Sequence, residues 1–176
     1  EQMVRVHYKE TGSGAETAVF IHGAACNLTF WSEQVEALAT AGRLLLIDLP
    51  GHGLSDKPHI AYSIDLFVEA VKAVLEATNT SKAVLIGHSM GTLIIRKFLR
   101  IYPQKVRGLV ALDGFVYLAK RPSRMEQRLN WLLFQTPLYQ LTWSANVKSL
   151  INNKMPPALH KKALDTMLNA PRHVVR

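Results

Sequence analysis

A serine stands between two glycines in residues 87–91, Gly-His-Ser-Met-Gly. The apolar run 84–86 directly precedes this pentapeptide, and a helical pattern follows it. At a tight turn from strand to helix, a serine takes a strained backbone conformation, and side chains at Gly87 and Gly91 would collide with their surroundings. Such a turn pushes the hydroxyl group of Ser89 into the open, where it could attack a carbonyl carbon as a nucleophile. The free N–H groups of the helix start would favour negative charge on a bound substrate.

Two further motifs accompany the serine pentapeptide. Residues 22–24, His-Gly-Ala, end an apolar run and are followed by Trp31, and residues 51–58 read Gly-His-Gly-Leu-Ser-Asp-Lys-Pro. In order and spacing, the three motifs resemble those of the lid-bearing α/β-hydrolases. This family contains esterases, lipases, perhydrolases and carbon–carbon bond hydrolases. The resemblance covers residues 4 to about 115 closely, whereas residues 116–176 resemble the start of the family's helical cap only in composition and position.

The resemblance implies roles for several residues around Ser89. The turn that contains Gly23 would supply one oxyanion-hole donor, the backbone N–H of Ala24, and the N–H of Met90 would be the second. His22 would brace this turn and would not be the catalytic base. The family likeness also makes His88 a residue of packing or polar support.

A serine hydroxyl is a weak nucleophile and requires a general base, usually a histidine oriented by a carboxylate. The family order is serine, acid, histidine, with the histidine in a loop after the last strand. Asp113 ends a predicted strand and is a candidate acid, although most relatives place the acid one strand later. His160 and His173 are the only downstream histidines, and neither follows a predicted strand. We therefore expect the base to be missing from this chain, which would be part of a longer protein.

Strand and helix patterns alternate over residues 4–113. Short apolar runs predict strands at residues 4–9, 18–21, 44–47, 84–86 and 109–112. Ser63 is the predicted N-cap of a helix that separates two of them. This alternation predicts an α/β fold with a mostly parallel sheet and helices on both faces, and ligands would bind at the carboxyl ends of the strands.

The sequence changes in character near Gly114. Residues 1–113 carry 11 Lys and Arg against 11 Asp and Glu, whereas residues 114–176 carry 10 against 2 and so hold the whole net charge of +8. From Pro122 onward, a helical pattern replaces the strand pattern. We therefore expect an α/β-hydrolase core at residues 1–115 and a helical cap or lid at residues 116–176. The sheet would be incomplete at its C-terminal end.

Composition excludes several classes of protein. A single cysteine, Cys26, rules out an internal disulfide framework and a multi-cysteine metal site, and we expect no metal and no cofactor. No apolar run reaches the roughly 20 residues of a membrane-spanning helix, so a soluble protein is expected. A cytoplasmic location is favoured over secretion, although Asn27 and Asn79 begin glycosylation sequons. Oligomeric state stays open.

Two hypotheses about function follow. The first is a serine hydrolase that acts on a carboxylic ester or related small acyl substrate through an acyl-enzyme on Ser89. Perhydrolases and carbon–carbon bond hydrolases keep the serine, so the sequence does not separate them from esterases. The second is a non-catalytic ligand-binding or receptor-like protein on the same fold. Nucleic-acid binding through the basic C-terminal segment is not expected, because the basic residues fit a solvated helix face.

Overall fold

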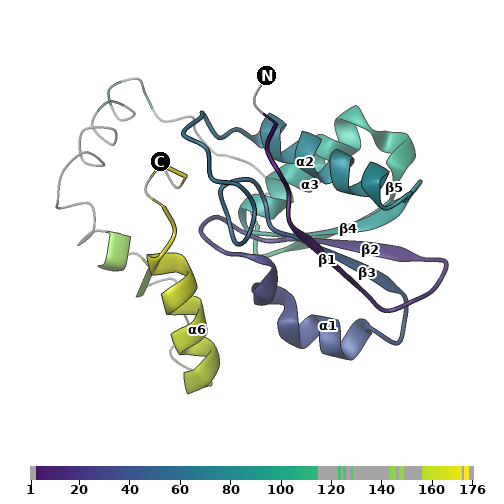
Figure 1. The fold of residues 1–176 in the computed structure, drawn as a ribbon, viewed down its shortest axis with the longest axis horizontal. Coiled ribbons are helices and arrows are strands. Elements are labelled where there is room, and N and C mark those ends of the chain that lie inside the picture. Colours follow the sequence, from purple (N-terminus) through teal and green to yellow (C-terminus); the bar gives the residue numbers. More distant parts are fainter. Residues whose placement is uncertain are drawn as a thin grey trace. The chain divides into compact units, whose positions relative to one another are not determined.

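A five-stranded sheet forms the centre of the first of two units, Glu1–Val116 and Tyr117–Arg176, into which the computed structural model of the chain divides (Figure 1). The structure describes residues 3–114, 123, 125, 128, 143–145, 147, 148, 156–171, 173 and 174. The strands are β1 (Tyr8–Thr11), β2 (Thr17–Ile21), β3 (Arg43–Ile47), β4 (Ala83–His88) and β5 (Val106–Leu112). Their spatial order is β1-β3-β2-β4-β5, and only β1 runs antiparallel to its neighbour. The predicted mostly parallel sheet is confirmed.

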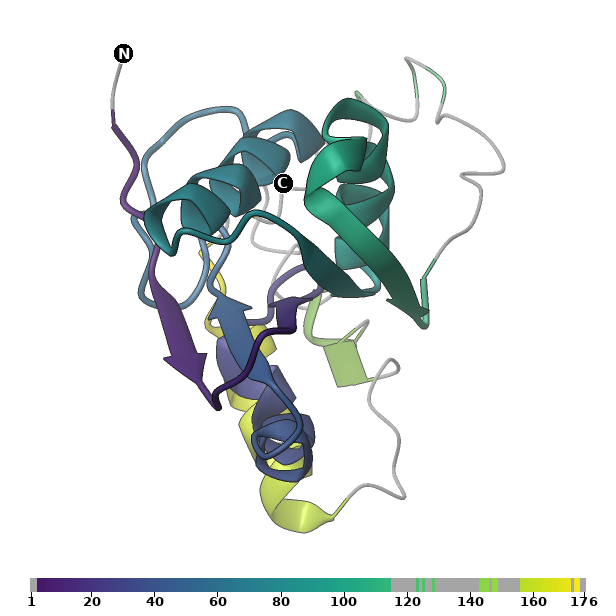
Figure 2. The ribbon, with the colours of Figure 1, turned by 90° about the vertical axis from the view of Figure 1, so that its right-hand side faces the viewer.

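Helices cover both faces of this sheet. The helix α1 (Ser32–Leu38) lies on one face, and α2 (Ile64–Ala77) and α3 (Met90–Ile101) lie on the other (Figures 1 and 2). Two short 3₁₀ turns, η1 (Leu28–Trp31) and η2 (Pro103–Lys105), complete the elements. The predicted N-cap of α2 is confirmed, because the Ser63 hydroxyl accepts the N–H of Leu66 at 3.2 Å.

The apolar side chains of the strands alternate between two cores. In β2, Val19 and Ile21 pack with α2 and α3, whereas Phe20 packs with Trp31 on the side of α1. This alternation follows from the period of two in a β-strand. Both faces of the central strands are therefore buried, which explains their continuous apolar runs.

The N-terminal strand begins later than predicted. Residues 4–7 were expected to belong to a strand, but β1 starts at Tyr8. Instead of pairing with a strand, this segment hydrogen-bonds to the loop that follows β3: Asp56 N–H donates to Arg5 O, and His7 N–H donates to the Ser55 hydroxyl at 2.8 Å. Residues 4–7 are thus held by a loop, and the alternation of apolar residues in a sequence does not predict such a partner.

The strand order creates a switch point between β2 and β4. The chain leaves β2 through α1 toward β3 on one side, and it leaves β4 through α3 toward β5 on the other. Because these connections diverge over opposite faces, the turns that follow β2 and β4 stand side by side at the carboxyl edge of the sheet. Ligands of open α/β sheets bind at such points.

The second unit contains helical structure. Its helix α6 spans Pro157–Leu168, and the indole N–H of Trp143 donates to Met167 O at 3.2 Å. Val147 and Val174 are buried. The helical pattern predicted from Pro122 onward rests in part on apolar residues at helical spacing, of which Met125 is exposed, and Leu129, Leu132 and Leu133 lie outside the described residues. None of the helices that the structure describes is long and apolar enough to cross a membrane.

Candidate functional site

Ser89 occupies a strained bend between β4 and α3. Its φ and ψ are +50° and −114°, a region that non-glycine residues rarely adopt and that typically costs about 1–3 kcal/mol. The bend is held on both sides. The Ser89 N–H donates to Leu112 O at 3.1 Å, and its carbonyl accepts the N–H and the hydroxyl of Thr92 at 3.0 and 2.7 Å. The strained conformation predicted from the pentapeptide is therefore present.

The two glycines that flank Ser89 lie where no side chain fits. A Cβ atom on Gly87 would lie 2.5 Å from the carbonyl oxygen of Gly91, and one on Gly91 would overlap the carbonyl oxygen of Ile21 in β2. These contacts involve backbone atoms, which have little room to move. The glycines thus allow β2, β4 and α3 to approach one another closely around Ser89.

The turn after β2 lies against this bend. A Cβ atom on Gly23 would come within 3.0 Å of His88 Nδ1 and 3.1 Å of Ser89 Cβ. Ala24, the next residue, is exposed to solvent. Among the described residues, neither the backbone N–H of Ala24 nor that of Met90 donates a hydrogen bond. Two free amides are therefore available close to the Ser89 bend.

His22 is fully buried and is engaged through both ring nitrogens. Nδ1 donates to Gly23 O at 2.7 Å, and Nε2 accepts the N–H of Leu49 at 3.1 Å. Its ring lies 5.0 Å from the ring of His52, measured between centroids. Burial lowers the pKa of His22 to about 3, and the neighbouring His52 acts in the same direction. A neutral ring occupied in this way is unsuited to serve as a base for Ser89.

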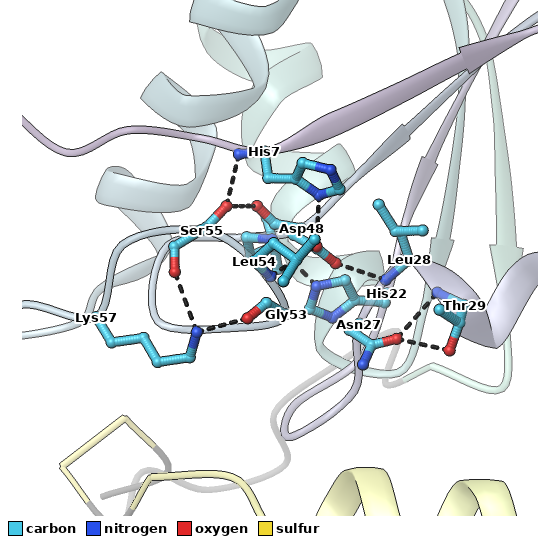
Figure 3. A network of polar contacts seen from close by, with 11 residues as sticks. His7, His22, Asn27, Leu28, Thr29, Asp48, Gly53, Leu54, Ser55 and Lys57 are labelled. Atoms are coloured by element: carbon cyan, nitrogen blue, oxygen red, sulfur yellow. Dashed lines mark hydrogen bonds and ion pairs between the residues drawn. The ribbon is translucent and has the colours of Figure 1, made fainter.

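A buried carboxylate organises the loop that follows β3 (Figure 3). Asp48 accepts the N–H of Leu28 at 2.7 Å, the N–H of Leu54 at 2.9 Å and Nδ1 of His7 at 2.8 Å. Its own carbonyl accepts the Ser55 hydroxyl at 2.6 Å. Segments from three parts of the chain therefore converge on one carboxyl group.

His88 forms part of an aromatic group beside Ser89. Its ring stacks on Phe30, with centroids 4.4 Å apart, and Trp31 approaches edge-on at 6.4 Å. The Nδ1 atom of His88 is buried and has no hydrogen-bond partner within the described part of the chain. Phe30 is 43% exposed, so one side of this group faces outward.

Asp113 follows β5 next to the Ser89 bend. His88 of β4 pairs with Leu112 of β5, so the residues after both strands lie at the same edge. Asp113 has a φ of +44° and is exposed. Its charge raises the pKa of His88, although burial, the larger effect, lowers it. The two histidines downstream of Ser89, His160 and His173, belong to the second unit.

The sequence alone did not indicate a structural role for three residues of this region, His7, Asp48 and His52. A signal did exist for Asp48, because it directly follows a buried apolar strand, as His22 and Ser89 do. His52 lies inside the motif at residues 51–58, which contributed to the family resemblance, but the sequence analysis gave His52 no role. Nothing in the local sequence marks His7, whose partner is 41 residues away.

The neutral histidines make stability depend on pH. Because the folded pKa of His22 is about 3 and an unfolded histidine titrates near 6.5, the unfolded chain binds the extra proton as pH falls. The stabilisation is complete above pH 6.5 and declines toward pH 3. Between pH 6.5 and 5, the free energy of unfolding in urea should fall by about 2 kcal/mol from His22 alone.

His22→Gln should reduce this pH dependence by the share of His22, whatever its effect at pH 7, while His52 and His88, whose pKa values burial also lowers, keep the remainder. Unfolding free energies that stay constant between pH 7 and 5 in the unsubstituted protein would contradict the prediction.

Comparison with known proteins finds a matching family model and similar proteins. Residues 18–166 match the family model described as alpha/beta hydrolase fold. The chain is 33% identical over 180 aligned residues to a 2-hydroxy-6-oxononadienedioate/2-hydroxy-6-oxononatrienedioate hydrolase of Paraburkholderia phymatum. That alignment covers 97% of this chain and 62% of the relative, so the chain spans less than two thirds of the relative's length.

Solved structures agree with this match. Est816, described as an N-acyl homoserine lactone degrading enzyme, aligns with a TM-score of 0.83 and 27% identity over 97% of this chain and 66% of that one. The enol-lactonase from Burkholderia xenovorans LB400 gives a TM-score of 0.84 over 98% and 67% of the two chains, and at 19% identity it supports the fold alone. Because the family model matches most of its length, the chain belongs to the alpha/beta hydrolase fold family.

Proposed function

We propose that the protein is a serine hydrolase that acts on a carboxylic ester or a related acyl substrate through an acyl-enzyme on Ser89. One observation carries the proposal: Ser89 occupies a strained bend at the start of α3, beside a turn whose Ala24 amide is free. Strain of this kind is retained where the surrounding structure enforces it, and it is concentrated at functional sites.

In the proposed reaction, the Ser89 hydroxyl oxygen attacks the substrate carbonyl carbon, and a general base takes the hydroxyl proton. The backbone N–H groups of Ala24 and Met90 donate hydrogen bonds to the oxyanion, each worth on the order of 3 kcal/mol of barrier. Collapse of the tetrahedral intermediate expels the protonated leaving group. Water then attacks the acyl-enzyme, which releases the acid and returns the proton to Ser89. Asp113 is the candidate for the acid that orients the base.

The names of two relatives fit a carbonyl substrate. A 6-oxo acid, in the name of the Paraburkholderia phymatum hydrolase, and a lactone, in the description of Est816, both contain a carbonyl carbon. These names span carbon–carbon and ester bonds, so the class of bond cleaved is the open part of the proposal. A panel of phenyl esters, lactones and vinylogous 1,5-diketones distinguishes the classes.

A second candidate is a non-catalytic binding protein on the same fold. It is favoured by the Ser89 hydroxyl, which has no hydrogen-bond partner among the described residues, so no base is in contact with it there. Fold alone does not decide, because one fold hosts many functions.

A fluorophosphonate probe separates the two candidates. Applied to the full-length protein, it should form a covalent adduct that peptide mapping locates at Ser89, because only an activated serine reacts at a useful rate. A folded protein that stays unlabelled would contradict the hydrolase proposal and favour the non-catalytic binding protein.

Phe30 should contribute to substrate binding. Its ring stacks on His88, the residue before Ser89, and is partly exposed, so we expect an acyl chain bound at Ser89 to cover part of it. Phe30→Ala should raise KM for p-nitrophenyl octanoate about 10-fold, the equivalent of about 1.4 kcal/mol of apolar contact, and should change KM for the acetate little. Steady-state kinetics with both esters provide the measurement.

Ile101→Ala is the matched control for Phe30→Ala. Ile101 is 44% exposed, close to the exposure of Phe30, but it lies at the opposite end of α3 from Ser89. Equal KM changes for octanoate and acetate in Phe30→Ala would place Phe30 outside the acyl site.

A further inference from the structure

Three hydrogen bonds connect the turn after β2 to the loop after β3. Each runs from a backbone N–H to a side chain: Leu49 N–H to His22 Nε2 at 3.1 Å, Ala25 N–H to His52 Nε2 at 3.3 Å, and Leu28 N–H to Asp48 Oδ1 at 2.7 Å. A bond of this type depends on the identity of one side chain, whereas a bond between backbone groups does not. The turn that contains Ala24 is therefore held by particular residues.

The contacts of His52 require its neutral form. Its Nδ1 lies 3.0 Å from the carbonyl oxygen of Pro50, which can only accept, so Nδ1 carries the proton. Its Nε2 faces the N–H of Ala25, which can only donate, so Nε2 must be unprotonated. The same argument applies to His22, with Nδ1 donating to Gly23 O.

The surroundings of His52 favour this neutral form. The residue is only 5% exposed, and burial lowers its pKa. The titratable and charged groups near the two rings are Asp48, which favours protonation, and Lys57 and His88, which oppose it at His52 and His22 respectively. A proton on Nε2 of His52 would also point at the N–H of Ala25 and remove their hydrogen bond.

Ala25 needs such a contact to keep its conformation. Its φ is +57°, a value that alanine seldom adopts, and the residue is buried. Without an acceptor for its N–H, Ala25 would lose one of the contacts that offset the cost of its positive φ, and alanine favours negative φ. A change to negative φ would rotate the peptide groups on either side of Ala25 and so redirect the preceding residue, Ala24.

We propose that His52 is a positioning residue of the oxyanion site: its unprotonated Nε2 holds the Ala25 N–H and thereby keeps the Ala24 N–H directed at the carbonyl that Ser89 attacks. The inference rests on the proposed function, because Ala24 is assigned to the oxyanion hole there. His52 touches no reacting atom, so its effect appears in the rate of the chemical step rather than in substrate binding.

Two amide variants of His52 test the role. In His52→Gln, the side-chain oxygen can reach the place of Nε2, whereas in His52→Asn it reaches only the place of Nδ1. We expect His52→Gln to keep kcat for p-nitrophenyl acetate within about 3-fold, and His52→Asn to lower kcat about 10- to 100-fold with KM unchanged. The rates are measured with the full-length protein and expressed per site, with sites counted by the end point of fluorophosphonate titration. His59→Asn, at an exposed histidine of the same loop, should match the unsubstituted protein.

Equal kcat values in the Gln and Asn variants overturn the positioning role, whether both are high or both are low. If neither variant folds, ¹⁵N NMR of the imidazole groups in the unsubstituted protein decides. An Nε2 of His52 without a proton throughout the pH range of hydrolysis supports the role, and a protonated Nε2 in the active protein overturns it. An unsubstituted protein that the probe does not label counts against the proposed function instead, so the two failures are distinguishable.

Discussion

Ser89→Ala is expected to lower kcat/KM for ester hydrolysis by about 10⁴- to 10⁶-fold and to abolish fluorophosphonate labelling. The magnitude follows from the proposed mechanism, in which Ser89 forms the covalent intermediate, since loss of a nucleophile leaves only the contribution of the oxyanion donors and of binding. Alanine removes the oxygen atom and keeps Cβ, so the bend between β4 and α3 should persist. Circular dichroism and urea unfolding of the variant should therefore resemble those of the unsubstituted protein.

Ser89→Gly is the matched variant that isolates backbone strain. Both substitutions remove the hydroxyl, so both proteins should be equally inactive. Glycine adopts the φ of +50° without strain, whereas alanine adopts it at an energetic cost, so the glycine variant should unfold with a free energy about 1 kcal/mol higher than the alanine variant. Hydrolysis that survives in both variants at the original rate would exclude Ser89 as the nucleophile.

The bend at Ser89 was predictable because its cause is local. Five consecutive residues specify a serine flanked by two positions without side chains, and the preceding apolar run and the following helical pattern specify what the turn connects. The steric reason is visible in the structure, where a Cβ atom on Gly87 would meet the backbone of Gly91. The alternation of Val19 and Phe20 between two cores has a similarly simple cause, the period of two in a strand.

The support around Ala24 was not predictable because its cause is long-range. Ala25 and His52 are 27 residues apart, and they meet because β2 and β3 are parallel neighbours whose last residues, Ile21 and Ile47, pair in register. Sequence patterns predict that strands exist, but they do not state which residues beyond the strand ends will face each other. The same limit explains the N-terminal segment, whose His7 bonds to Asp48 across 41 positions.

One physical difference explains why the bend at Ser89 was predictable and the support around Ala24 was not. A position with no room for a side chain requires glycine, so the sequence itself reveals it. A hydrogen-bond acceptor, in contrast, can be supplied by several residue types from any neighbouring element. Buried polar contacts such as Leu28 to Asp48 are therefore recognised only once the fold is known. The experiments of greatest value are those that separate steric requirements from polar ones.

Gly91→Ala is expected to destabilise the protein by about 3–4 kcal/mol, measured by urea unfolding. The added Cβ would overlap Ile21 O and lie 3.1 Å from His22 O, both backbone atoms of β2 and its end, so either α3 or the strand must move. Such movement would shift the turn with Ala24 relative to Ser89. In the fraction that remains folded, fluorophosphonate labelling should accordingly be at least about 100-fold slower.

Gly108→Ala is the control for this steric argument. Gly108 lies in β5 with a negative or extended backbone conformation, and a Cβ there would meet only Val84 Cγ2, at 4.0 Å. Alanine should fit and leave stability unchanged or raise it by about 0.5 kcal/mol, because it reduces the entropy of the unfolded chain. If Gly91→Ala were as stable and as reactive as Gly108→Ala, then close approach of α3 to β2 would not be what requires glycine two residues after Ser89. The geometry of the proposed oxyanion site would then have to be maintained by the polar contacts of His22, His52 and Asp48 alone.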